Sequence, residues 1–211
     1  MKGLIKDTII IFLITLVAGG ILGFVYELTK TPIEGQKILK QANACAEVFK
    51  EWNENGELVS VTELTFDEID VNEAALETAN ENNDIKASVT EVYEAFDPSG
   101  NHYGYVISVT TKEGYGGDIK FYMGITDDGV LKGISILEIH ETPGLGMRAE
   151  EVLVPQFKNL TGDEFTVTKT GKVTDTEIDA ITSATITSKA LTRGVNYGLK
   201  YARAIKEGGD R

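Results

Sequence analysis

Cysteine and histidine are scarce in this chain, and each scarcity excludes a class of site. Cys45 is the only cysteine, so the chain has no internal disulfide, and one thiol offers neither an iron–sulfur cluster nor a cysteine-based zinc site. We expect Cys45, in a segment with helical spacing, to be a small buried residue. His102 and His140 are the only histidines and lie far apart in the sequence, so we expect no metal site.

Basic residues are too few to balance the acidic ones. The chain has 20 Lys and Arg against 33 Asp and Glu, which gives a net charge of −13. The first 33 residues hold three lysines and two acidic residues, so the rest of the chain carries −14. A domain this acidic repels nucleic acid and anionic lipid surfaces. We therefore exclude nucleic acid as a partner.

Charge is absent altogether from Thr8 to Tyr26, a run of nineteen residues. About twenty apolar residues are needed to cross a bilayer, so the run predicts one transmembrane helix. A cleaved signal peptide is the alternative, because Lys2 and Lys6 precede the run. However, the run is longer than a signal core and no A-x-A-like site follows it. Lysines on both sides leave the orientation undecided by charge.

Pro32 is expected to end this helix, and the apolar spacing then predicts a second helix over residues 33–52. Residues 53–87 are rich in Asn, Glu and Asp, and we expect a solvated surface there. The sequence therefore divides into four parts: a transmembrane anchor at 1–32, a helical neck with a variable surface region at 33–87, a folded domain at 88–206 and a tail at 207–211.

The folded domain begins with a strand pattern in place of the helical one. Two hairpins are expected, each with a turn that contains Gly: one from 89–96 and 103–109, the other from 119–125 and 130–138. Helical spacing then predicts a broken helix over 147–160, a strand over 165–168 and an amphipathic helix over 189–206. The fold class is α+β, an antiparallel sheet with flanking helices.

Hydroxyl side chains gather between Asp179 and the last predicted helix. They are Thr182, Ser183, Thr185, Thr187 and Ser188. Helix capping explains one or two of them, because a hydroxyl oxygen accepts the first unpaired backbone N–H groups. The same N–H groups and the positive end of the helix dipole also favour a phosphate. Spacing alone leaves both interpretations open.

Two glycine-rich stretches flank the second hairpin. The first is Gly114-Tyr115-Gly116-Gly117, which indicates a loop with positive φ angles. The second runs from Glu141 through Thr142, Pro143, Gly144 and Leu145 to Gly146. It offers backbone N–H groups and an apolar leucine to a flat heterocycle, and a plain surface turn is the alternative.

These three segments, in this order, resemble those of FMN-binding domain proteins. Asp179 followed by Thr182-Ser183-Ala184-Thr185 is similar to the flavinylation motif D-x-x-[S/T]-G-A-T, with Ser183 where Gly is commonest. The resemblance implies FMN joined by a phosphoester to Thr185, and Thr187 is the alternative acceptor. It also implies a set of residues around the cofactor: Glu141, Thr142, Gly144, Leu145, Gly146, Thr182, Ser183, Ala184 and Thr187.

With the N-terminal anchor included, the chain resembles the G subunit of the Rnf ion-translocating electron-transport complex, a ferredoxin–NAD oxidoreductase. The resemblance implies a single-pass protein of the inner (cytoplasmic) membrane with its FMN domain on the extracytoplasmic face. Other integral-membrane and redox subunits are the implied partners, with a separate flavin transferase for maturation. The chain would relay electrons without turning over a substrate of its own.

Two alternatives remain beside the Rnf-type subunit. The C subunit of the Na⁺-translocating NADH–quinone reductase carries the same motifs, although the compact length favours the Rnf type. A non-redox scaffold is the other alternative, in which the threonine cluster only caps a helix. The surplus of hydroxyls and the two glycine-rich loops argue against a scaffold, which needs neither.

Overall fold

The computed structural model describes residues 2–52, 58–60, 63–81 and 85–209. The chain forms two compact units, Met1–Ala42 and Asn43–Arg211, and each is described by itself.

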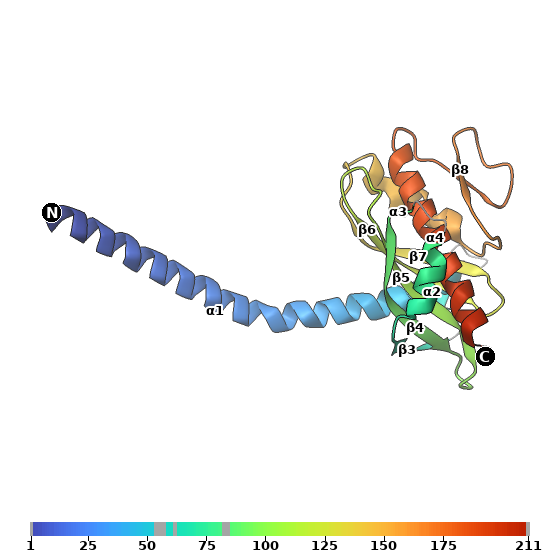
Figure 1. The fold of residues 1–211 in the computed structure, drawn as a ribbon, viewed down its shortest axis with the longest axis horizontal. Helices are drawn as coiled ribbons and strands as arrows, with labels where there is room; N and C mark the ends of the chain where they lie inside the picture. Colours follow the sequence, from blue (N-terminus) through green and yellow to red (C-terminus); the bar gives the residue numbers. More distant parts are fainter. Residues whose placement is uncertain (1, 53–57, 61–62, 82–84, 210–211) are drawn as a thin grey trace. The chain divides into compact units, whose positions relative to one another are not determined.

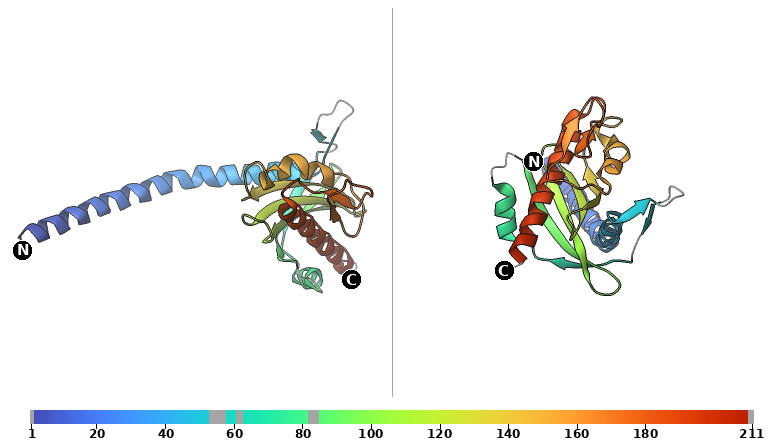
Figure 2. Two further views of the ribbon diagram at one scale, coloured as in Figure 1. Left: turned by 90° about the horizontal axis from the view of Figure 1, so that it is seen from above. Right: turned by 90° about the vertical axis from the view of Figure 1, so that its right-hand side faces the viewer.

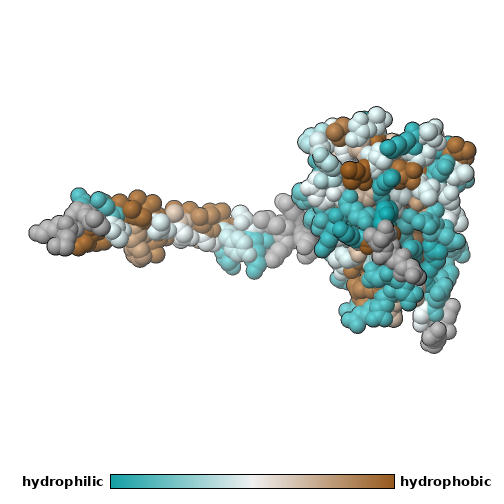
Figure 3. Space-filling view, turned by 45° about the horizontal axis from the view of Figure 1, so that its top comes forward, coloured by the Kyte–Doolittle hydropathy of each residue, from teal (hydrophilic) through white to brown (hydrophobic). Residues whose placement is uncertain are grey.

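The first unit is helical. Helix α1 (Lys2–Glu47) is shown in Figure 1 and contains an apolar stretch, Ile5–Lys30, that is long enough to cross a membrane. The side chains of this stretch are exposed (Figure 3). The helix was expected to end at Pro32, and that expectation was wrong. A proline removes one backbone hydrogen bond, and the helix continues because the turns on both sides keep theirs. The second expected helix also ends earlier, at Glu47, and Lys50–Trp52 is strand β1, paired with β2 (Leu58–Ser60).

The second unit is built on a five-stranded antiparallel sheet in which each strand pairs with the next along the chain. The strands are β3 (Thr65–Ile69), β4 (Ala87–Phe96), β5 (His102–Thr111), β6 (Ile119–Thr126) and β7 (Leu131–Ile139). The four expected strands and their meander are confirmed. Strand β3 is an addition, from a region where only solvated surface was expected.

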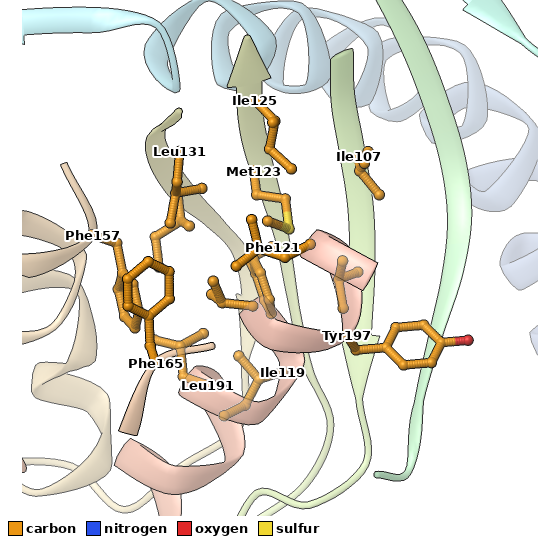
Figure 4. Close-up of a cluster of buried hydrophobic side chains, with 14 of the residues drawn as sticks. Ile107, Ile119, Phe121, Met123, Ile125, Leu131, Phe157, Phe165, Leu191 and Tyr197 are labelled. Carbon is orange, nitrogen blue, oxygen red and sulfur yellow. The ribbon is translucent and has the colours of Figure 1, made fainter. Parts of the chain in front are cut away.

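Helices α2 (Glu73–Asn80) and α4 (Thr185–Gly209) cover one face of the sheet (Figure 1, Figure 2). The main core lies between α4 and the sheet, and it includes Leu191 and Tyr197 from α4 and Phe121 and Met123 from β6 (Figure 4). Gly198 allows this close approach, since a Cβ there would overlap Met123 Sδ. Helix α4 is therefore fixed along its length against the central strands.

The opposite face of the sheet carries a smaller apolar cluster that includes the end of α1. Gly124 pairs with Gly133 across β6 and β7, and a Cβ on Gly124 would lie 2.7 Å from Val48 Cγ2. Cys45 is buried in this cluster, as expected. Burial, assisted by the nearby Glu91 carboxylate, raises the pKa of its thiol to about 12, so the thiol stays protonated. The compact unit thus begins at Asn43, whereas the sequence placed the start of the domain at residue 88.

The segment after β7 contains short pieces, as the expected broken helix over 147–160 requires. They are η1 (Gly146–Arg148), α3 (Ala149–Val152) and η2 (Val154–Phe157). Strand β8 (Thr166–Thr168) then pairs in parallel with β9 (Glu177–Asp179). The end of β9 is held by Gln156, whose Oε1 accepts from Asp179 N at 2.7 Å and whose Nε2 donates to Asp179 O at 3.1 Å.

Helix α4 is longer at both ends than the sequence predicted. It begins at Thr185, four residues before the expected start, because a turn closes directly in front of it. It continues to Gly209, through residues 207–209 of the expected tail, and the last two residues lie outside the described ones.

Candidate functional site

A cavity of about 490 Å³ opens at the N-terminal end of α4, where three segments that are distant in the sequence meet. It contains eight of the ten predicted cofactor residues: Glu141, Thr142, Leu145, Gly146, Ser183, Ala184, Thr185 and Thr187. Thr182 and Gly144 are exposed and lie outside its lining. Tyr115 and Ile186 line the cavity although they were not predicted to. The sequence offered one sign for each residue: Tyr115 is an aromatic residue between glycines, and Ile186 is an apolar residue between two threonines.

A tight turn from Ile181 to Ala184 leads into α4. Ala184 N donates to Ile181 O at 3.0 Å, and Ser183 has a φ of 66°. A turn of this kind, with positive φ at its third residue, favours Gly at that position, as in a type II turn. This explains why Gly is commonest where Ser183 stands. Ser183 adopts the same backbone at a steric cost.

Replacing Ser183 by Gly is expected to stabilise the protein. A left-handed residue with a Cβ costs about 1–2 kcal/mol, and the greater freedom of Gly in the unfolded chain offsets about 0.5–1 kcal/mol. The free energy of unfolding in urea should rise by the difference, about 0.5–1 kcal/mol. Ser99→Gly is the control, because Ser99 lies in a turn at negative φ. An equal response of the two variants would contradict the assigned strain.

Thr185 and Thr187 differ in access to solvent. Thr185 is the first residue of α4, half-buried on the cavity wall. Thr187 is 1 % exposed and packs on the second glycine-rich loop, where a Cβ on Gly146 would lie 2.7 Å from Thr187 Oγ1. Of these two side chains, Thr185 is therefore the more accessible from solvent. It also lies at the positive end of the helix, where backbone N–H groups lack partners within the helix.

Glu141 joins the two glycine-rich loops. Its side chain is 8 % exposed and accepts hydrogen bonds from Tyr115 N at 2.7 Å and Gly116 N at 3.1 Å. The loops touch so closely that a Cβ on Gly116 would overlap His140 O. The same carboxylate therefore lines the cavity and fixes the loop that carries Tyr115.

Apolar side chains surround the cavity. In the described part of the Asn43–Arg211 unit, the exposed large apolar residues are Tyr115, Leu145, Met147, Val173 and Ile186. Three of the five line the cavity, and Met147 follows its second loop. A hydrophobic rim around a few fixed polar groups is the usual composition of a cofactor site. The arrangement suits a flat apolar ring system joined to an anionic group.

A second hollow, of about 440 Å³, lies near the other end of α4. Its basic side chains are engaged within the protein. Arg203 pairs with Asp163 at 2.9 Å, and Lys206 Nζ donates to Asp127 O at 2.5 Å. The hollow contains none of the predicted cofactor residues.

Residues 114–200 match the FMN-binding domain family. The chain is 42% identical over 104 residues to the G subunit of the Na⁺-translocating ferredoxin:NAD⁺ oxidoreductase complex of Acetobacterium woodii, covering 48% of this chain and 50% of that relative. It is 40% identical over 105 residues to the G subunit of the proton-translocating ferredoxin:NAD⁺ oxidoreductase complex of Clostridium ljungdahlii, covering 49% and 56%. Both matches thus span about half the length of these relatives.

A weaker likeness extends over nearly the whole chain. The G subunit of the ion-translocating oxidoreductase complex of Methanosarcina acetivorans is 28% identical over 205 residues, which is 96% of each protein. Among solved structures, the crystal structure of Shewanella oneidensis NqrC has a TM-score of 0.47 at 22% identity, covering 56% of this chain and 59% of that one. Residues 114–200, with the two glycine-rich loops and the Thr185 motif, therefore belong to the FMN-binding domain family, in a chain homologous to the G subunits of ion-translocating oxidoreductase complexes.

Proposed function

We propose that this chain is the membrane-anchored electron-carrying subunit of an ion-translocating ferredoxin–NAD oxidoreductase complex, with FMN bound covalently to Thr185. One observation carries the proposal. Thr185 is the first residue of α4, and it lies on the wall of a cavity that residues of both glycine-rich loops also line. The names of the relatives, G subunits of such complexes, support the electron-transfer role. Other integral-membrane and redox subunits are the partners we infer.

The cavity fits the two ends of FMN. A phosphate on Thr185 would face the first N–H groups of α4 and the positive end of its dipole. The isoalloxazine would lie against Leu145, Ile186 and Tyr115, in a volume within the usual range for small-molecule sites. FMN supplies the redox chemistry, and the protein supplies binding, orientation and the local charge.

Glu141 sets that local charge. Its buried carboxylate lies on the cavity wall, so its negative charge disfavours further negative charge on a reduced flavin. We therefore infer that Glu141, together with the acidic domain, lowers the flavin potential.

Attachment requires a second protein, because an unassisted threonine hydroxyl is a weak nucleophile. We infer a flavin transferase that uses FAD and a divalent cation. The Thr185 Oγ–phosphorus bond forms, the anhydride P–O bond of FAD breaks, AMP leaves and the hydroxyl proton is released. The phosphoester then prevents loss of FMN by dissociation on the extracytoplasmic face, where we place the domain. The apolar stretch of α1 supports a single-pass anchor in the inner membrane.

The mass of the native protein tests the covalent linkage. The chain isolated from its own membranes should exceed the mass of the polypeptide by one FMN less one water, and peptide mapping should place the addition on Thr185. Electron transfer from ferredoxin in the co-purified complex tests the redox role. A bare chain in an active complex would refute the linkage, and a bare chain without redox partners would favour the scaffold alternative.

A further inference from the structure

The hydroxyl of Ser188 joins the first turn of α4 to the backbone just before Thr185. Ser188 is fully buried, and its Oγ accepts from Ile181 N at 3.0 Å while donating to Ala184 O at 2.9 Å. A serine hydroxyl has one proton to donate and lone pairs to accept, and here both functions are used. The sequence marked Ser188 only as one hydroxyl of a cluster.

The two groups that Ser188 binds are the ends of the turn before α4. Ala184 N donates to Ile181 O at 3.0 Å, so this turn is closed once by its own backbone and a second time by Ser188. Ser183, within the turn, has the strained φ of 66°. The Ser188 hydroxyl therefore holds a strained turn in a fixed orientation relative to the helix, and Thr185 is the next residue.

We propose that Ser188 is a positioning residue for flavin attachment, which presents Thr185 Oγ to the flavin transferase. The inference rests on the proposed function. The incoming phosphorus must approach Thr185 Oγ along one direction, and displacements of about 1 Å at a reacting atom can cost about a hundredfold in rate. Without the hydroxyl, the buried Ile181 N–H loses its partner, and the turn keeps only the backbone bonds from Ala184 N to Ile181 O and from Ser188 N to Ala184 O.

Thr192 provides a matched control on the same helix. Thr192 is 2 % exposed, and its Oγ1 donates to Ser188 O at 2.9 Å, the same four-residue spacing that Ser188 uses toward Ala184. It lies one turn further from Thr185. Loss of its hydroxyl therefore removes a similar buried hydrogen bond without releasing the turn.

The experiment compares flavinylation rates of the full-length chain, purified in detergent without flavin, with FAD, Mg²⁺ and the flavin transferase. Ser188→Ala is expected to slow the initial rate, followed by in-gel flavin fluorescence and intact mass, by about ten- to a hundredfold. Thr192→Val should keep the wild-type rate, and Ser188→Thr, which retains a hydroxyl, should recover most of it. Unfolding midpoints of all variants show whether the rate follows the hydroxyl or only stability.

Each outcome decides one question. An unchanged rate in Ser188→Ala, or an equal slowing in an equally destabilised Thr192→Val, overturns the positioning role. If Ser188→Ala does not fold, hydrogen exchange of the Ile181 amide in the wild type decides instead. Slow exchange supports the bond to Ser188, and exchange as fast as in an open loop refutes it. A wild-type chain that takes up no flavin refutes the proposed covalent FMN, and a Thr185→Val variant that takes it up refutes Thr185 as the attachment site.

Discussion

Replacing Thr185 by Val is expected to remove all denaturant-stable flavin, whereas Thr187→Val keeps it. Each substitution deletes one hydroxyl and preserves the branched shape at Cβ. Thr185 is half-buried on the cavity, while Thr187 is 1 % exposed against the second glycine-rich loop. Both residues line the cavity, and the nearly complete burial of Thr187 leaves Thr185 as the more accessible of the two. Flavin fluorescence in a denaturing gel and intact mass measure the result.

The Thr185→Val substitution should leave the stability of the fold nearly unchanged. Val and Thr have similar helix propensities, and a change at a half-exposed first helical residue alters the free energy of unfolding by about 0.5 kcal/mol or less. Loss of flavin would then follow from the missing oxygen alone. Fluorescence that persists in Thr185→Val and disappears in Thr187→Val would move the attachment site to Thr187. Persistence in both would show that neither Thr185 nor Thr187 is required for the attachment.

The sequence predicted those strands whose residue pattern and flanking turns can be recognised from neighbouring positions alone. The two hairpins have apolar alternation and turns rich in Asp, Pro and Gly, so the meander follows from neighbouring residues. Strand β3 and helix α2 were not predicted because they contribute little apolar surface of their own. In α2 only Ala75 and Ala79 are buried. Their order comes from contacts across the fold, such as Tyr201 OH accepting from Asn72 N at 2.9 Å.

The sequence was enough to predict which residues lie at the site, but not how they are arranged and bonded to one another. Motif order identified eight of the residues that line the cavity, because each motif is local. The start of α4 was placed too late, since the bonds that fix it, from Ser188 to Ile181 and Ala184, join residues on both sides of a turn. The sequence likewise could not show that Glu141 binds the first glycine-rich loop. That contact joins positions separated by 25 and 26 residues.

Replacing Glu141 by Ala is expected to release that loop and weaken the whole site. Two hydrogen bonds to a buried carboxylate are lost, each worth about 1.5–3 kcal/mol, and water can replace part of this because Tyr115 is 71 % exposed. The free energy of unfolding in urea should fall by about 2–3 kcal/mol in total. Glu141→Gln keeps one acceptor oxygen and should lose about half as much. Glu138→Ala, which removes an exposed carboxylate near the end of β7, is the control and should change little.

The fluorescence and the midpoint potential of the flavin should give a second, independent measure of the Glu141→Ala substitution. Thr185 does not contact Glu141 through any hydrogen bond among the described residues, so Glu141→Ala should still carry covalent flavin. With Tyr115 no longer held on the cavity wall, iodide should quench the flavin fluorescence more strongly than in Glu138→Ala. The midpoint potential should rise, because a negative charge beside the reduced flavin has been removed. If Glu141→Ala matches Glu138→Ala in stability and in quenching, the first glycine-rich loop holds its position without Glu141. If the midpoint potential of Glu141→Ala is unchanged, the flavin lies away from this carboxylate.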